Sequence, residues 1–303
     1  MRKLALVLVA GLLALTAAGC GEDDEGAATT AADTGAAATE AAGDECAKDT
    51  LQTVADGTLT IGTDNPAYPP WFDGGSQDKK WELNDPSTGK GFESAVSYAI
   101  ADQLGFSKAE VEWTYVPFNN SFKPGPKDFD FDVNQISITP ERAQAVDFSD
   151  SYYDVNQALV ALEGTPIASA TSVADLKQYK LGAQIGTTSF KYIDEQIQPD
   201  QDPSVYDTSN DVINALKAKQ IDGIVVDLPT AFFIVAAELD GGTIVGQFPN
   251  VGGEQEQFGL VFEKGSPLVS CVNEAIATLK DDGTLADIQQ QWLSENADAP
   301  VLE

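Results

Sequence analysis

Short apolar runs alternate with amphipathic segments along residues 59–293. Runs of four to six apolar or alternating residues predict strands, and longer segments with helical spacing predict helices between them. We expect strands at residues 59–62, 111–116, 129–133, 158–162, 180–183, 221–226 and 258–262. We expect helices at residues 91–104, 211–219, 228–239, 266–281 and 285–293. This alternation is typical of an α/β protein with mostly parallel sheets. Because the block from residue 158 repeats the order of the first, two similar lobes fit better than one domain.

Residues 136–154 (ISITPERAQAVDFSDSYYD) contain the most informative transition from strand to helix. Ile136 and Ile138 alternate with polar residues, and Thr139 and Pro140 are typical of a helix start. Arg142 then falls in the first turn of a short helix, just beyond a strand end. Open α/β sheets bind ligands at the carboxyl ends of their strands, where a guanidinium can bind a carboxylate through two hydrogen bonds. The alternative is a surface arginine on an amphipathic turn.

Three further segments carry candidate chemistry. Residues 184–189 (QIGTTS) follow a predicted strand and precede a helix, so their backbone N–H groups and hydroxyls would suit an anion. Asp227 ends the strand at 221–226. Residues 64–72 (DNPAYPPWF) form a proline-stiffened loop rich in aromatic residues, which is either a packing plug or a ligand platform.

The first twenty residues predict export. Arg2 and Lys3 precede an apolar run that is too short to span a bilayer comfortably, and small residues lead to Cys20. Residues 15–20 (LTAAGC) resemble a bacterial lipobox, with Ala17 where leucine is usual, so we expect a signal peptide at 1–19 and a lipid on Cys20. Ordinary cleavage and release is the alternative. Residues 20–50 are expected to form a tether, since residues 21–45 lack large apolar side chains.

The composition excludes several classes of function. The chain carries 17 basic and 48 acidic residues, a net charge of −31, which leaves no basic footprint for nucleic acid. It contains no histidine, the commonest general base and zinc ligand. The sequence contains no CxxC, P-loop, GxGxxG or GxSxG motif. We therefore expect no catalytic residue, no metal and no cofactor.

Two cysteines remain once Cys20 is assigned to lipid. Cys46 and Cys271 would meet in an oxidising location, so a disulfide between them is expected, and two free thiols are the alternative.

In order and spacing, several segments resemble family 3 of the bacterial extracellular solute-binding proteins, the amino-acid receptors of ABC importers. They are LTIGTDNPAYPPWF, KGFESAVSYAIADQLGF, ISITPERAQAVDFSDSYY, QIGTTS, IDGIVVDLPTA, FGLVFEKGSPL and CVNEAIATLKDDGTLADIQQQWL, and the resemblance covers residues 51–293. It implies a two-lobed periplasmic-binding-protein-like (Venus flytrap) fold with the ligand in the cleft. The hinge crossings would lie near residues 152–156 and 254–258. Lobe 1 would comprise residues 51–153 and 258–303, and lobe 2 residues 154–257.

The resemblance also implies roles for the charged and hydroxyl side chains. Arg142 matches the arginine that pairs with the α-carboxylate of the ligand, and Ser137 matches a strand-end serine beside it. Thr187 and Thr188 match the lobe 2 turn that closes on the same carboxylate. Asp227 matches the acid that receives the α-ammonium group.

Other residues would contact the ligand's side chain. Tyr68 and Phe118 match the aromatic residues that enclose it, and Asp64 and Gln184 match positions that help set specificity. Residues 134–135 (Asn-Gln) stand where relatives often have small residues, so the shape of that wall differs here.

These residues predict a receptor that binds a free polar amino acid and delivers it to an ABC permease. We expect a monomer held by Cys20 on the extracytoplasmic face of the cell membrane, and no enzyme activity. The ligand's side chain stays open: Asp64 could accept from an amide, a guanidinium or an ammonium, whereas Lys123 and Lys191 could attract an acid. The alternatives are an enzyme on the same fold, such as a cyclohexadienyl dehydratase, and a ligand-sensing module of a signalling system.

Overall fold

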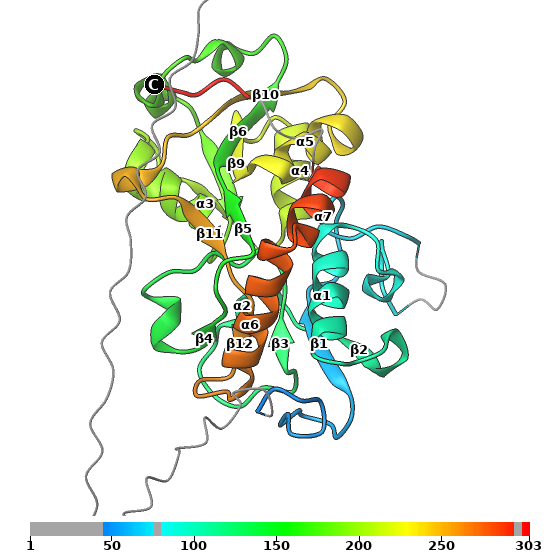
Figure 1. The fold of residues 1–303 in the computed structure, drawn as a ribbon. Coiled ribbons are helices and arrows are strands. Elements are labelled where there is room, and N and C mark those ends of the chain that lie inside the picture. The colour runs from blue at the N-terminus through cyan, green and yellow to red at the C-terminus, as the bar shows by residue number, and fades with distance from the viewer. Residues whose placement is uncertain (1–44, 76–79, 294–298) are drawn as a thin grey trace, which may run out of the picture. The chain divides into compact units, whose positions relative to one another are not determined.

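The computed structural model describes residues 45–75, 80–293 and 299–303. Within them the chain forms two five-stranded sheets, each with its own helices, joined by a two-stranded ribbon (Figure 1). The predicted signal peptide, the predicted lipidation at Cys20 and most of the predicted tether fall outside the described residues. In the part of the chain that is described, no helix is both long and apolar enough to cross a membrane.

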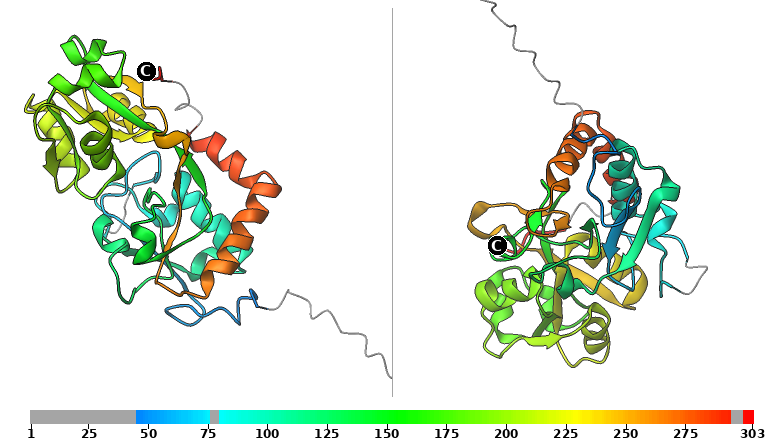
Figure 2. Two further views of the ribbon diagram at one scale, coloured as in Figure 1. Left: turned by 90° about the vertical axis from the view of Figure 1, so that its left-hand side faces the viewer. Right: turned by 90° about the horizontal axis from the view of Figure 1, so that it is seen from below.

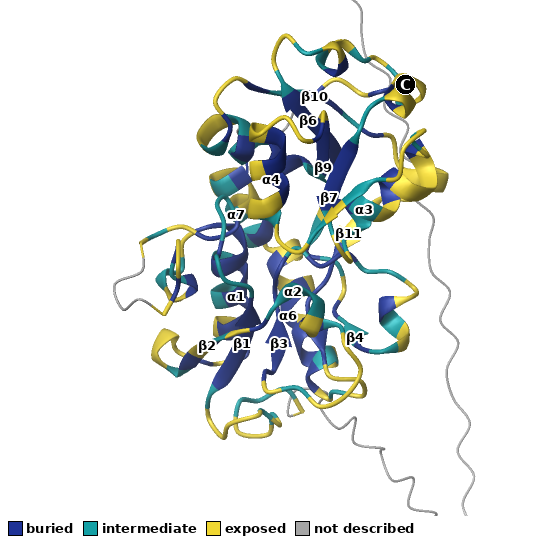
Figure 3. Ribbon diagram, turned by 180° about the vertical axis from the view of Figure 1, so that it is seen from behind, coloured by how far each residue is buried: buried dark blue, intermediate teal, exposed yellow. Residues whose placement is uncertain are grey.

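The first sheet has the strand order β2-β1-β3-β12-β4. Its strands are β1 (Leu59–Thr63), β2 (Val111–Tyr115), β3 (Phe131–Asp132), β4 (Asp147–Phe148) and β12 (Val261–Phe262). The helices of this half are α1 (Phe92–Gln103), α2 (Phe118–Ser121), α6 (Leu268–Asp281) and α7 (Thr284–Leu293). Apolar residues of α1, α6 and α7 share one core with those of β1 and β3, as the buried interior in Figure 3 shows.

The second sheet has the strand order β10-β6-β9-β7-β8. Its strands are β6 (Gln157–Leu162), β7 (Leu181–Gln184), β8 (Ser204–Tyr206), β9 (Gly223–Asp227) and β10 (Gly242–Gln247). The helices of this half are α3 (Thr188–Tyr192), α4 (Ser209–Lys217) and α5 (Leu228–Phe233). A π-helical turn at Ile234–Glu238 continues α5 over the predicted helical range. Two apolar clusters stabilise this half.

Two short strands join the halves. β5 (Tyr153–Val155) leaves the first half and β11 (Glu256–Phe258) returns to it, and they pair antiparallel with Glu256 opposite Val155. Both lie within the predicted hinge crossings. The exact lobe boundaries remain a prediction.

The expectation of mostly parallel sheets holds for strand direction, because in each sheet four of the five strands run one way and one runs the other way. β1 pairs in parallel with β2 and β3, but β12 runs antiparallel to β3 and β4. In the second sheet, β6 is antiparallel to both β9 and β10. These strands enter each sheet from the ribbon rather than from a βαβ crossover, so they run opposite to their neighbours. The strand predicted at 258–262 is also split, since Gly259 and Leu260 separate β11 from β12.

Residues 299–303 pack on the second half, although the sequence placed everything after residue 258 in lobe 1. Leu302 is buried in one of the second half's clusters, and its backbone N–H donates to the carbonyl oxygen of Gln247 at the end of β10. Figure 2 shows this end of the chain beside the strands of that half. β10 is an edge strand, and the segment covers part of its free edge.

The expected disulfide is present. Cys46 and Cys271 are joined, with their Cα atoms 5.4 Å apart, and the bond ties the start of the described chain to α6. It lies in the core of the first half, away from the second sheet.

Candidate functional site

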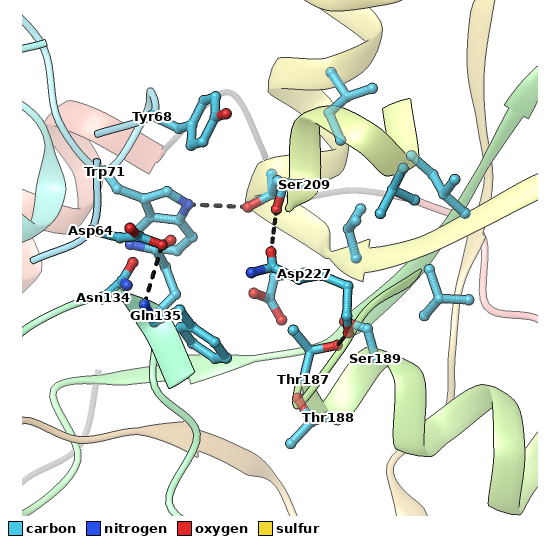
Figure 4. Close-up of a pocket in the computed structure, with 18 of the residues that line it drawn as sticks. Asp64, Tyr68, Trp71, Asn134, Gln135, Thr187, Thr188, Ser189, Ser209 and Asp227 are labelled. Carbon is cyan, nitrogen blue, oxygen red and sulfur yellow. Dashed lines mark hydrogen bonds between the residues drawn. The ribbon is translucent and has the colours of Figure 1, made fainter. Parts of the chain in front are cut away.

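One cavity between the two halves is lined by all nine side chains that the sequence singled out. They are Asp64, Tyr68, Phe118, Ser137, Arg142, Gln184, Thr187, Thr188 and Asp227. Figure 4 shows most of this lining, with Asp64, Tyr68 and Trp71 on one side and Thr187, Thr188 and Asp227 on the other. Their roles toward a ligand remain predictions.

Arg142 is held rigidly at the cavity. It starts a 3-10 turn at Arg142–Gln144, which agrees with the short helix predicted after Thr139. The backbone N–H of Arg142 donates to Thr139 Oγ1. Its Nη1 donates to the carbonyl oxygen of Ser137 at 2.7 Å, and its guanidinium lies over the rings of Phe122 and Phe118. The side chain is 9 % exposed, so the surface alternative is wrong.

No carboxylate in the described part of the chain forms an ion pair with Arg142. Burial lowers the pKa of its guanidinium to about 10, which leaves it charged at neutral pH. Within the described residues its side-chain hydrogen bonds go only to carbonyl oxygens, so a buried cation with unused N–H groups faces the cavity.

The opposing turn lies between β7 and α3. Gly186 has a left-handed φ of +80°, and a Cβ there would lie 2.1 Å from Asn119 Oδ1 of the first half, so glycine permits this close approach. Thr187 caps α3, and its Oγ1 accepts from the backbone N–H of Phe190. Thr188 Oγ1 lies 3.3 Å from Ser137 Oγ of the other half. The turn therefore presents hydroxyl groups toward Arg142.

Asp227 ends β9, as predicted, and its carboxyl accepts from Gln157 Nε2 at 2.6 Å. Burial first, and then the charge of Glu256, raise the pKa of Asp227 to about 8. Asp227 has no ion-paired cation among the described residues, so its neutral form is favoured, and a cation bound beside it would stabilise its ionised form.

Asp64 faces the cavity from the end of β1. Its carboxylate accepts from the backbone N–H groups of Asn65, at 2.8 Å, and of Phe118, at 3.3 Å. Burial raises its pKa. These backbone hydrogen bonds hold the carboxylate in place. Arg142 is the only cationic side chain among the described residues that line the cavity.

Several residues of the site were not predicted. Trp71, which the sequence pattern placed only in the aromatic-rich loop at residues 64–72, is 1 % exposed and lines the cavity. Its Nε1 donates to Thr230 Oγ1 of α5, which joins the two halves. Ser209, at the start of α4, also lines the cavity, and its Oγ donates to Gln184 Oε1. No sequence pattern marks these contacts, because the first depends on how the halves meet and the second on how α4 packs beside the end of β7.

The two lysines considered for an acidic ligand lie elsewhere. Lys123 Nζ donates to Asn120 Oδ1 in an exposed turn. Lys191 Nζ lies 3.8 Å from Glu195 Oε1, also exposed. Neither belongs to the cavity's lining. Among the described residues, no group of acids and cysteines is arranged to hold a metal ion.

Comparisons with known proteins agree on the relationship. The family profile described as bacterial extracellular solute-binding proteins, family 3, matches residues 59–295. The arginine-binding extracellular protein ArtP of Bacillus subtilis (strain 168) is 26 % identical over 221 residues, which cover 71 % of this chain and 82 % of ArtP. The L-cystine-binding protein TcyJ of Escherichia coli (strain K12) is 29 % identical over 242 residues, which cover 78 % of this chain and 82 % of TcyJ.

A solved structure shows the same fold. The ancestral amino acid-binding protein AncCDT-1, described as a precursor of cyclohexadienyl dehydratase, superposes with a TM-score of 0.63 at 26 % identity. The match covers 78 % of this chain and 95 % of that protein.

Proposed function

Because the chain belongs to family 3 of the bacterial extracellular solute-binding proteins, we propose that it binds a free polar amino acid between its two halves and delivers it to an ABC-type permease. The observation that supports this most strongly is the position of Arg142 and Asp227. A buried cation and a partly buried acid line one cavity from opposite halves.

An amino acid carries a carboxylate and an ammonium group on the same carbon atom. Arg142 supplies the fixed cation, and the hydroxyl groups of Ser137 and Thr188 lie beside it. Asp227 supplies the anion. Since each half carries only one of the charges, the ligand is fully bound only when the halves are closed on it, and binding favours the closed form.

The charges of the cavity favour a cationic side chain. Two acids, Asp64 and Asp227, line the cavity. Among the described residues, Arg142 is the only cationic side chain that lines it. If Arg142 and Asp227 are used by the zwitterion, Asp64 remains as an uncompensated acid. A guanidinium or ammonium group would neutralise it, whereas an acidic side chain would meet repulsion. ArtP, an arginine-binding relative, agrees with this preference.

A ligand screen tests the proposal. Thermal shift and calorimetry with the common amino acids should give binding in the micromolar range or tighter, with the tightest ligand cationic. The variant Arg142→Ala should lose that binding, while Lys123→Ala, which removes an exposed cation outside the cavity, should retain it. No response to any amino acid would contradict the proposal.

We further propose that Cys20 carries the lipid that keeps the protein on the extracytoplasmic face of the membrane as a monomer. A Cys20→Ala variant should leave the membrane fraction for the soluble one without losing ligand binding. If it stayed with the membrane, another attachment would be responsible.

The similarity to AncCDT-1 keeps an enzyme on this fold as a second candidate. The raised pKa of Asp227 would allow it to act as a general acid at neutral pH. Turnover of prephenate or arogenate by the purified protein, lost in Asp227→Asn, would establish this activity in place of transport. A role as a sensor of a signalling system would require a separate partner protein.

A further inference from the structure

The hinge ribbon contributes one carboxylate to the polar network beside the cavity. Glu256, the first residue of β11, accepts from Ser137 Oγ at 2.6 Å through Oε1. Its Oε2 accepts from Gln157 Nε2 at 3.1 Å. Ser137 belongs to the first half and Gln157 begins β6 of the second, so this one side chain is bound to both halves.

Gln157 links Glu256 to Asp227. It is 4 % exposed, and its Nε2 donates to Asp227 Oδ1 as well as to Glu256. Its Oε1 accepts from Ser189 Oγ at 2.6 Å, which fixes the orientation of the amide. A neutral amide group bridges two acids here. It satisfies their hydrogen bonds but cannot cancel their charges.

The charged groups around this pair are mostly acidic. Arg142 is the cation that acts on Asp227, and Glu93 of α1 adds a further negative charge. Glu256 also lines a second hollow, together with Glu254, Lys191 and Glu195. Lys191 and Glu195 form an ion pair with each other. The surroundings therefore provide little positive charge to stabilise both carboxylates at once.

We infer that Glu256 is a positioning residue of the amino-acid site: together with burial, its charge favours the protonated form of Asp227 in the absence of ligand, so that Asp227 releases a proton when the ligand's ammonium group binds. This inference rests on the proposed function. The proton passes from the Asp227 carboxyl to solvent, and the ammonium group keeps its own protons. Glu256 lies on the hinge strand β11 and bonds to Ser137 and Gln157, so it also connects the release of the proton to the hinge.

The direction of the effect follows from the site. Burial and Glu256 raise the pKa of Asp227 to about 8, so the acid is mostly protonated at pH 7 before binding. A bound ammonium group stabilises the carboxylate and lowers its pKa, so binding releases a proton. Affinity should then rise with pH between about 6 and 8 and level off above the pKa of the empty site.

Calorimetry at pH 7 in two buffers of different ionisation enthalpy measures the protons released. With the tightest-binding amino acid, the parent should release most of one proton per ligand. Glu256→Gln should release markedly less, and its affinity should change less between pH 6 and 8, because Asp227 loses its repelling neighbour. Glu256→Ala removes the same charge together with the rest of the side chain, and it should release as few protons as Glu256→Gln.

Glu254→Gln is the matched control, since it removes an exposed acid of the same segment that has no bond to Asp227 or Gln157. It should release as many protons as the parent. Equal proton release by Glu256→Gln and the parent would overturn the inference while leaving the receptor function intact. Failure of the parent to bind any amino acid would instead reject the proposed function.

Discussion

Arg142 of the first half donates from Nη2 to the carbonyl oxygen of Gly186 in the second, at 2.9 Å. The guanidinium thus contacts the opposing turn directly, as well as the carbonyl oxygen of Ser137 in its own half. Trp71 makes a second direct bond across the cavity, to Thr230. The two halves can therefore meet through protein groups alone, and a ligand would add to contacts that already exist.

The planar arrangement of the N–H groups of Arg142 is expected to contribute to ligand affinity as much as its charge does. Arg142→Lys keeps a cation but loses the planar arrangement that reaches Ser137, Gly186 and a ligand carboxylate together. We expect affinity to fall by about 10- to 150-fold, the equivalent of losing about 1.5–3 kcal/mol of hydrogen bonding to a charged group. Calorimetry measures the loss. A variant that bound like the parent would show that charge alone is enough.

Asp64→Asn tests the preference for a cationic side chain. The amide keeps nearly the same shape but removes the negative charge, so binding of a cationic amino acid should weaken by about 1–3 kcal/mol. Binding of an uncharged polar amino acid such as glutamine should change much less. Competition calorimetry with both ligands gives the ratio, and an unchanged ratio would remove Asp64 from the basis of specificity.

Buried acids make the stability of the fold fall as pH rises. Burial raises the pKa of Glu93 from 4.5 to about 7, and its carboxyl accepts from the Tyr152 hydroxyl and the Gln135 backbone. The pKa of the fully buried Asp132 is also well above its usual value. Because the folded state holds these protons more tightly, their stabilisation is full below about pH 4.5 and is lost as pH rises through 7.

Urea unfolding at several pH values measures this slope. Glu93→Gln should reduce the loss of unfolding free energy between pH 5 and 8, since the amide does not ionise. Asp175→Asn, at an exposed acid whose hydrogen bonds lower its pKa, should leave the decline in place. A parent protein whose stability increased over this range would contradict the account.

The disulfide should stabilise the fold without affecting the cavity. Cys46 and Cys271 are 225 positions apart, so reduction frees a very long loop, and its removal should cost about 2–4 kcal/mol. The double variant Cys46→Ser/Cys271→Ser should unfold at lower denaturant concentration and keep its ligand affinity. Loss of affinity at full folding would mean that α6 influences the cleft.

The local pattern predicted those parts of the fold and the site that depend on neighbouring residues. β1, α1 and β9 lie close to their expected positions, because apolar spacing and a following glycine or acid mark their ends. Arg142 and Asp227 could be selected because the sequence pattern places each of them just beyond a predicted strand end.

Contacts made by distant segments could not be predicted in the same way. Gln157 meets Asp227 because β6 pairs with β9, and Glu256 reaches Gln157 from β11, which pairs with β5, so three separate parts of the chain come together. The directions of β6 and β12 depend on how the chain returns from the ribbon. Leu302 follows Val301 in a segment too short to predict an element, and only the packed sheet shows where Leu302 is buried.

The attachment of residues 299–303 to the second half has a practical consequence. Glu303 pairs with the backbone of Thr171 and Val173, whereas the other end of the described fold is fixed by Cys46 to α6 of the first half. A fluorescent donor placed beside Glu45 and an acceptor placed beside Glu303 would therefore be attached to different halves. Energy transfer between them would follow the angle of the cleft in real time, without any label near the ligand.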